Sequence, residues 1–157
     1  MEGITFRRAS PDDLREIYSI EKLCFTTPWS INSFSYELVN KDSILKVAVF
    51  KNNIIGYVCI RIILDVTHVL NLAVSHEFRR MGIGSELLRY ALHELEVLRP
   101  DIDVITLEVR TSNKEAVKLY EKFGFKHRGR RTDYYLKPPE DAVIMALDIK
   151  KNVVKTS

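Results

Sequence analysis

The chain contains few of the residues that bind metals or form disulfides. Its 157 residues include two cysteines, Cys24 and Cys59, and four histidines. The cysteines lie far apart in apolar surroundings and form no CxxC pair, so we expect both to be reduced core thiols. Because the histidines share no ligand spacing with one another or with the cysteines, we predict no metal site.

Long hydrophobic runs and a strong charge of one sign are also absent. No apolar stretch approaches the length that crosses a bilayer, and residues 1–8 contain no apolar signal core. We therefore expect a soluble cytoplasmic protein without membrane contact. The formal net charge of +3 is too small to be typical of a nucleic-acid-binding domain, so no such binding is predicted. The densest basic cluster, Lys126 to Arg131, favours a solvated turn and strand over contact with RNA or phosphate.

The composition is that of a globular domain. Hydrophobic residues make up 46% of the chain and charged residues 29%, which argues against long disordered segments. A chain of this length can bury one core without disulfides. We expect a single domain over residues 1–150 and a flexible tail over residues 151–157. The sequence does not indicate the oligomeric state.

Hydrophobic periodicity predicts an α/β fold with a mixed sheet. The order of about seven strands and about four helices is typical of a sheet that has helices on both faces. Residues 132–141, which contain Tyr134-Tyr135 and Pro138-Pro139, are predicted to form a loop. Strands are expected at residues 4–8, 44–51, 54–64, 67–74, 104–110, 125–131 and 142–149, and helices at residues 10–25, 30–39, 83–98 and 113–123.

Two glycines between a predicted strand and a predicted helix indicate an anion site. Arg79-Arg80-Met81-Gly82-Ile83-Gly84 leads into the helix, whose first backbone N–H groups have no partner within it. The glycines lack the Cβ atoms that would hold a diphosphate away, and the arginines add charge. A dinucleotide fingerprint needs glycine at Leu87, and a P-loop needs Gly-Lys-Ser/Thr at residues 84–86, so neither fits. The alternative is an ordinary strand-to-helix turn.

Glu108 is a candidate for chemistry because of its place in a strand. In residues 104–110, Ile105, Leu107 and Val109 are expected on one face and Glu108 on the other. A carboxylate in the middle of a sheet is costly unless it lines a wet groove or meets a partner. The alternative is a structural ion pair with Arg110 or another base on that face.

Asn113 and Tyr120 follow Glu108 on the next helix. Asn113 stands at the N-cap, and Tyr120 lies seven residues further along the same helix face. A capping asparagine and a core tyrosine are the ordinary interpretations of these residues taken singly. Their order after Glu108, beside the glycine turn, favours a functional interpretation.

These residues resemble the GNAT superfamily of acyl-CoA N-acyltransferases. Arg79 to Gly84 is similar to the pyrophosphate-binding motif of that family, and Leu119 to Phe125 is similar to its later helix-and-turn motif. The resemblance extends from about Ile4 to Ile149. Within the superfamily, Phe25 to Ser30, Leu107 to Asn113, the Tyr134-Tyr135 pair and Glu140-Asp141-Ala142 are similar to RimI-type protein N-α-acetyltransferases.

The resemblance implies a GNAT fold, acetyl-CoA as the donor and no metal. It implies that the pyrophosphate binds at the glycine turn, that the pantetheine arm pairs with the preceding strand, and that Asn113 bonds the arm. The Val74 N–H would stabilise the oxyanion, Glu108 would be the general base, and Tyr120 would be the general acid at the departing sulfur. The implied donor-binding residues are Leu72, Ala73, Val74, Arg79, Arg80, Met81, Gly82, Ile83, Gly84, Ser85 and Asn113.

The acceptor implied by the resemblance is the free α-amino group of a protein N-terminus, possibly that of a ribosomal protein. Trp29, Tyr134 and Tyr135 are expected to line the acceptor groove; the alternative for these aromatic residues is packing that closes two loops on the core. A small-molecule or lysine acetyltransferase on the same fold, and a non-catalytic acyl-CoA-binding module, are the alternative functions. Short peptides with free or blocked α-amines separate these possibilities.

Overall fold

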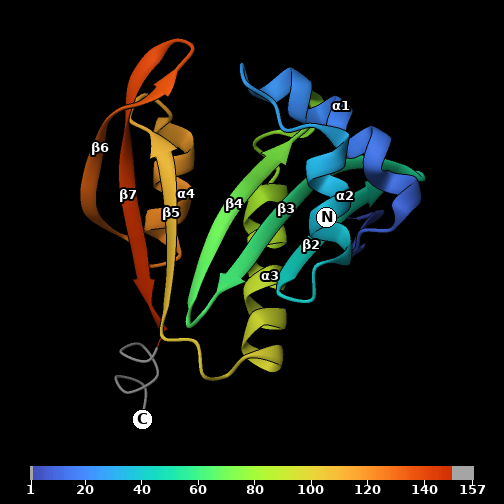
Figure 1. Cartoon of the computed structure of the whole chain (residues 1–157). Helices are drawn as coiled ribbons and strands as arrows, with labels where there is room; N and C mark the ends of the chain where they lie inside the picture. The colour runs from blue at the N-terminus through green and yellow to red at the C-terminus, as the bar shows by residue number, and fades with distance from the viewer. Residues whose placement is uncertain (1, 150–157) are drawn as a thin grey trace. The chain divides into compact units, whose positions relative to one another are not determined.

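The computed structural model describes residues 2–149, and Figure 1 shows the arrangement of their helices and strands. The strands are β1 (Ile4–Arg8), β2 (Ser43–Phe50), β3 (Asn53–Ile63), β4 (Val66–Val74), β5 (Val104–Arg110), β6 (Lys126–Leu136) and β7 (Pro139–Asp148). The helices are α1 (Leu14–Cys24), α2 (Ile31–Val39), α3 (Ile83–Leu98) and α4 (Lys114–Lys122), with short 3-10 turns at Pro11–Asp13 and His76–Phe78. The tail predicted at residues 151–157 lies outside the described residues.

The strands pair in the order β1-β2-β3-β4-β5-β7-β6, which makes a seven-stranded mixed sheet. The β4–β5 pair is parallel and covers three residues of each strand, from Val66 paired with Val104 to His68 paired with Thr106. The β5–β7 and β6–β7 pairs are antiparallel. The predicted α/β mixed sheet with four helices is therefore confirmed.

The chain divides into two compact units, which we describe separately. The first unit contains the residues up to Arg61 and Val69–Pro100, and the second contains Ile62–His68 and the described residues from Asp101 onward. Within residues 2–149, no helix is long and apolar enough to cross a membrane.

The first unit has its helices on both faces of its strands. In Figure 1, α1 and α2 lie in front of the strands of this unit and α3 lies behind them. Helix α3 buries one apolar stripe, as its spacing predicts. On the face of the strands that α1 and α2 cover, buried apolar side chains form a cluster that includes Tyr57 and Phe34. Gly56 of β3 allows close packing here, because a Cβ atom at this position would lie 3.0 Å from the Ala73 carbonyl oxygen and 3.1 Å from Leu87 Cδ1.

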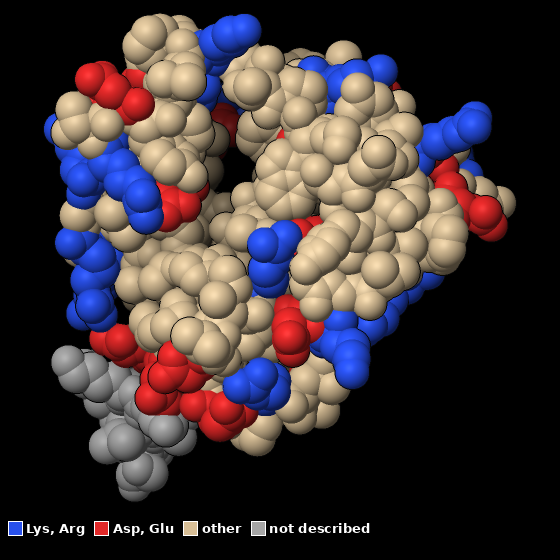
Figure 2. Space-filling model, viewed as in Figure 1, with Lys and Arg blue, Asp and Glu red and all other residues tan. Residues whose placement is uncertain are grey.

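The second unit is built on β5, β7 and β6, with α4. Ile105, Leu107 and Val109 of β5 are buried and Glu108 is not, so the predicted alternation of that strand is confirmed. The basic strand β6 is exposed along nearly its whole length. Several of its arginines pair with carboxylates, such as Arg128 with Asp148 at 2.8 Å. On the face shown in Figure 2, positive and negative side chains are interspersed.

The prediction of a loop over residues 132–141 is wrong. Strand β6 continues to Leu136 and β7 begins at Pro139, so only Lys137 and Pro138 form the turn. Tyr134 and Tyr135 favour a strand, while Pro139 takes the first position of β7, where a missing N–H is tolerated. The pairing register shifts between Arg131 and Tyr135, and Asp133 has a φ of +53°. This irregularity interrupts the alternation of side chains, so the sequence shows no regular strand pattern there.

A network around Arg110 and Glu140 holds this turn, and we call it the Arg110–Glu140 latch. The Arg110 guanidinium donates to the carbonyl oxygens of Lys137 and Pro138, both at 3.0 Å, and to Glu140 at 3.2 Å. The Glu140 carboxylate also accepts from the Thr111 hydroxyl at 2.9 Å and the Ser112 N–H at 2.6 Å. Hydrogen bonds from Ser112, supported by those from Thr111 and Arg110, lower the pKa of Glu140 to about 2.

The latch predicts an acid-sensitive contribution to stability. The pKa of Glu140 is lower in the folded protein than the value of about 4.3 expected for an unfolded chain, so its ionised form stabilises the fold above pH 4.3. This contribution is lost as the pH falls toward 2. Glu140→Gln should therefore lower the urea midpoint at pH 7, and its deficit relative to the wild type should shrink as the pH is lowered. Urea titrations from pH 7 to pH 3 measure this, with Glu77→Gln at an exposed position as control. A deficit independent of pH would contradict the assignment.

Candidate active site

The glycine turn predicted to bind an anion adopts the required backbone conformation. Arg80 and Gly82 both have left-handed φ angles, of 64° and 82°, and Gly82 is the N-cap of α3. The first α-helical bond of α3 is donated by Glu86 to the Gly82 carbonyl at 3.1 Å. The N–H groups of residues 83–85 precede it and project from the positive end of a 16-residue helix.

This geometry fits a diphosphate. Ile83 is buried, which anchors the start of the helix, while residues 79–82 are exposed. A turn in which left-handed residues alternate with others, as Arg80 and Gly82 do here, can make a concave set of N–H groups that suits an anion. A side chain at position 82 would be strained at its φ, so glycine is favoured there.

Strand β4 leads into this turn and presents one edge of its backbone away from β3. The Ser75 N–H donates to the Ile55 carbonyl of β3 at 2.8 Å, and the Ala73 carbonyl lies on the Gly56 side. Because successive residues of an extended strand direct their N–H and C=O groups to opposite edges, those of Leu72 and Val74 point away from β3. This edge can pair with an extended ligand, as predicted for the pantetheine arm.

The Arg79 guanidinium makes hydrogen bonds within the protein, whereas a side chain that only bound phosphate would point to the ligand. Its Nε donates to the Val74 carbonyl at 3.2 Å, and a terminal nitrogen contacts the Cys24 sulfur at 3.2 Å. The Cys24 thiol also lies 3.8 Å from the same carbonyl. Arg79 therefore fixes the end of β4, a structural task that its sequence position did not reveal, and its predicted contact with the donor stays a prediction.

In the second unit, Glu108 lies on the polar face of β5 and pairs with a base other than Arg110, so the ion pair given as the alternative from the sequence is observed. Arg131 Nε lies 3.5 Å from a Glu108 carboxylate oxygen, whereas Arg110 belongs to the Arg110–Glu140 latch. The Glu108 side chain is 32% exposed and that of Arg131 is 55% exposed. A half-exposed pair of this kind is weak.

Asn113 and Tyr120 occupy the positions that their spacing predicts on α4. The Asn113 side-chain oxygen accepts from the Ala116 N–H at 3.2 Å, so its capping role is observed. Tyr120 is the buried residue of α4, and its ring lies edge-on to Phe125 at 5.6 Å. Burial raises the pKa of the Tyr120 phenol, and the neighbouring Tyr135 raises it further.

The three aromatic residues predicted for the acceptor side lie in different surroundings. Tyr134 and Tyr135 form an edge-to-face pair at 5.0 Å, and the guanidinium of Arg110 lies 4.2 Å from the centre of the Tyr135 ring. Trp29 packs on Phe34 at 5.3 Å, so the core-packing alternative is observed for its ring. The Tyr134 side chain is the most exposed of the three, at 46% for the residue.

The predicted site residues fall into two groups. The first unit brings together the donor residues of β4 and the glycine turn with Trp29, and the second contains Glu108, Asn113, Tyr120, Tyr134 and Tyr135. Sequence reasoning assigned no role to the side chains of Glu21 and Asn71, which bond one another in the first unit. The signal that could have identified Glu21 is its position, as a carboxylate, on the apolar face of α1. Residues 2–149 contain no group of three or more His, Cys, Asp or Glu side chains that could hold a metal ion.

Known proteins share the sequence and fold of this chain over nearly its whole length. Residues 14–125 match the family described as the acetyltransferase (GNAT) family. A Bacillus subtilis relative, named provisionally as a ribosomal protein bS18-alanine N-acetyltransferase, is 35% identical over 141 residues, 89% of this chain and 92% of its own. The Escherichia coli K12 protein of that name is 34% identical over 140 residues, 87% of this chain and 92% of its own.

A solved structure gives the same result for the fold. The crystal structure of the ribosomal-protein-S18-alanine N-acetyltransferase from Escherichia coli superposes with a TM-score of 0.83 at 31% identity, covering 93% of this chain and 94% of that one. The predicted GNAT fold and the resemblance to RimI-type enzymes are thus confirmed. The chain belongs to the GNAT family of acetyltransferases and is an N-acetyltransferase that uses acetyl-CoA.

Proposed function

We propose that the chain transfers the acetyl group of acetyl-CoA to the free α-amino group of a protein N-terminus. What carries the proposal is the similarity, along nearly the whole chain, to enzymes named for the N-terminal alanine of ribosomal protein bS18. The corresponding ribosomal protein is the first substrate to test, and such a substrate would be met in the cytoplasm.

The chemistry of an α-amine suits a carboxylate base. An α-amino group titrates at about 7.7 to 8.0, whereas a lysine amine titrates at about 10.4 and needs more than two further pKa units of help. Glu108 lies on a strand, partly exposed, with only the weak Arg131 pair to displace. It is proposed to accept the proton that the amine loses as it attacks, directly or through water.

The proposed reaction is a direct transfer. The amine nitrogen attacks the thioester carbonyl carbon, the new C–N bond forms, and the carbonyl oxygen becomes an oxyanion that accepts from the Val74 N–H. Glu108 takes the proton from the amine. The C–S bond then breaks, the carbonyl re-forms, and coenzyme A leaves as a thiolate that is protonated. The residues proposed to hold the donor are those of the glycine turn, Leu72 to Val74 and Asn113.

Tyr120 is proposed to stabilise the departing thiolate. A phenol of ordinary pKa near 10 gives its proton to a thiolate, whose thiol has a pKa near 8.5, in a step that is uphill by about 2 kcal/mol. Burial raises the pKa of Tyr120, which makes the phenol a weaker acid and the transfer more uphill. We therefore assign Tyr120 a hydrogen bond to the sulfur, with the final proton coming from solvent.

The acceptor class is tested by peptide acetylation. The protein, acetyl-CoA and a library of short N-terminal peptides are incubated and read by mass spectrometry, with α-blocked, lysine-containing peptides as controls. We expect acetylation of the free α-amine peptides, including one beginning with the N-terminus of the ribosomal protein. Acetylation of the blocked peptides or of small amines alone would identify the alternative enzyme, and acetyl-CoA binding without any turnover would indicate a binding module.

Glu108→Gln is expected to impair the proton transfer. The amide keeps the size of the side chain but cannot take up a proton, so kcat should fall about 100-fold while the KM for acetyl-CoA stays within about twofold. Steady-state kinetics at pH 7 to 9 measure this. The loss should be smaller at high pH, where more of the α-amine is already neutral. A kcat within threefold of the wild type at pH 7 would remove Glu108 from the reaction.

Tyr120→Phe removes only the phenol oxygen. Loss of a hydrogen bond to a developing anion should lower kcat by about tenfold or more and change the KM for acetyl-CoA much less. If the phenol donates a hydrogen bond and not its proton, kcat should depend on pH in the same way at high pH in the wild type and in the variant. An unchanged kcat would contradict the role.

A further inference from the structure

Glu21 is a buried carboxylate that the proposed reaction does not use. It lies on α1 and is 1% exposed. Its oxygens accept three hydrogen bonds, from the Trp29 N–H at 2.9 Å, the Asn71 side-chain amide at 2.8 Å and the Tyr57 hydroxyl. All three donors are neutral groups. Burying a carboxylate without a cation is costly, so an apolar residue would have been the cheaper choice for stability alone.

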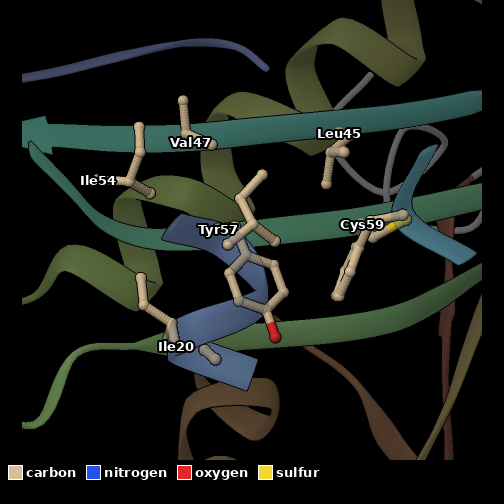
Figure 3. Packing of buried hydrophobic residues seen from close by; sticks show 9 residues of the cluster. Ile20, Leu45, Val47, Ile54, Tyr57 and Cys59 are labelled. Carbon is tan, nitrogen blue, oxygen red and sulfur yellow. The ribbon is translucent and has the colours of Figure 1, made fainter. Parts of the chain in front are cut away.

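The three bonds connect parts of the first unit that bear on catalysis. Trp29 belongs to the loop between α1 and α2, Tyr57 lies on β3, and Asn71 is the residue before Leu72 on the donor strand β4. Figure 3 shows the Tyr57 ring among the apolar side chains of this unit, with its hydroxyl at the far end of the ring. One carboxylate thus fixes the loop and β4 to the same point.

We propose that Glu21 is a positioning residue for acetyl transfer, which ties the acceptor loop at Trp29 to the donor strand β4. The inference rests on the proposed function, because it takes the Trp29 loop as part of the acceptor side. A second contact supports the tie, since one turn further along α1 the Cys24 thiol meets the Val74 carbonyl at 3.8 Å. The end of α1 therefore holds β4 at both Asn71 and Val74.

The Trp29 ring is also attached to the residues around Glu21. It packs on Phe34, whose ring lies edge-on to Tyr57 at 5.5 Å. The hydrogen bond from the Trp29 N–H to Glu21 is the polar contact that attaches the loop. Without it, the loop would keep the ring contact but lose the hydrogen bond that sets the position of its backbone.

The individual carboxylate oxygens permit a sharp substitution. Oε2 accepts from Trp29, while Oε1 accepts from both Tyr57 and Asn71. In Glu21→Met, a side chain of similar length has no carboxylate oxygen, so neither the Trp29 N–H nor the Asn71 NH₂ group keeps its acceptor. The loop and β4 are then no longer held to the same point. Glu21→Gln is a less sharp test, because Asn71 can turn its amide and present its own oxygen to the new NH₂ group.

A double substitution keeps both bonds in a different form. In Glu21→Gln with Asn71→Asp, the glutamine oxygen accepts from Trp29 and its NH₂ group donates to the carboxylate at position 71. The net charge of the cluster is unchanged. Tyr57→Phe is the matched control, because it removes a buried bond to the same carboxylate but leaves the Trp29 and Asn71 bonds in place.

Two readouts are compared among these variants, after melting curves have shown that each is folded at the assay temperature. The first is the pair of KM values for an acceptor peptide and for acetyl-CoA. The second is acrylamide quenching of tryptophan fluorescence, which reports on this loop alone because Trp29 is the one tryptophan of the chain.

Glu21→Met should raise the peptide KM by about tenfold, leave the KM for acetyl-CoA within about threefold and increase Trp29 quenching. The double variant should keep both readouts near the wild type, and Tyr57→Phe should change neither. Unchanged readouts in folded Glu21→Met, or a double variant as impaired as Glu21→Met, would overturn the proposal. If the wild type acetylates no peptide, the proposed function fails, and the quenching comparison still decides whether Glu21 holds the loop.

Discussion

The alternation of strand β4 is the constraint on which the first unit depends. Ala73 directs its carbonyl toward β3, and the Ser75 N–H returns to Ile55, so the backbone of Val74 between them must face the other edge. The side chains alternate as well, with Asn71 and Ala73 buried and Leu72 and Val74 only partly so. One strand therefore supplies a core face on one side and an edge suited to the donor on another.

Several interactions serve to hold that strand in place. Gly56 lets β3 and Leu87 of α3 approach β4 closely, Arg79 bonds the Val74 carbonyl, and Glu21 bonds the Asn71 side chain. Each acts on a different side of β4. The glycine turn begins directly after this strand, so fixing β4 also fixes the start of α3 and the N–H groups at its positive end.

The sequence predicted the features that depend on local pattern. Glycine at position 82 needs only its own backbone conformation, and the alternation around Glu108 needs only the period of a strand, so both could be recognised from neighbouring residues. The order of strands and helices followed from the same periodicity. The similarity to RimI-type enzymes, which carries the function, was also visible in short local segments.

The features that were missed depend on residues distant in sequence. Glu21 meets Asn71 across 50 residues. An ion pair of Glu108 was anticipated but its partner was left open, because pairing of β5 and β6 with β7 sets which base becomes its neighbour, and that base is Arg131. The strands around Lys137 and Pro138 were hidden for the same reason, since Tyr135 pairs with Glu140 only once the turn has formed. Local composition does not contain this information.

Amide-resolved hydrogen exchange of Val74 with and without acetyl-CoA tests the central claim most directly. Because this N–H points away from β3, it should gain protection when acetyl-CoA is added, whereas the Ala73 amide, which faces β3, should already be protected and change little. The Val74 signal should respond to acetyl-CoA before any acceptor is present. Equal exchange of Val74 in the free and acetyl-CoA-bound protein would contradict the account of β4 as the donor-binding strand.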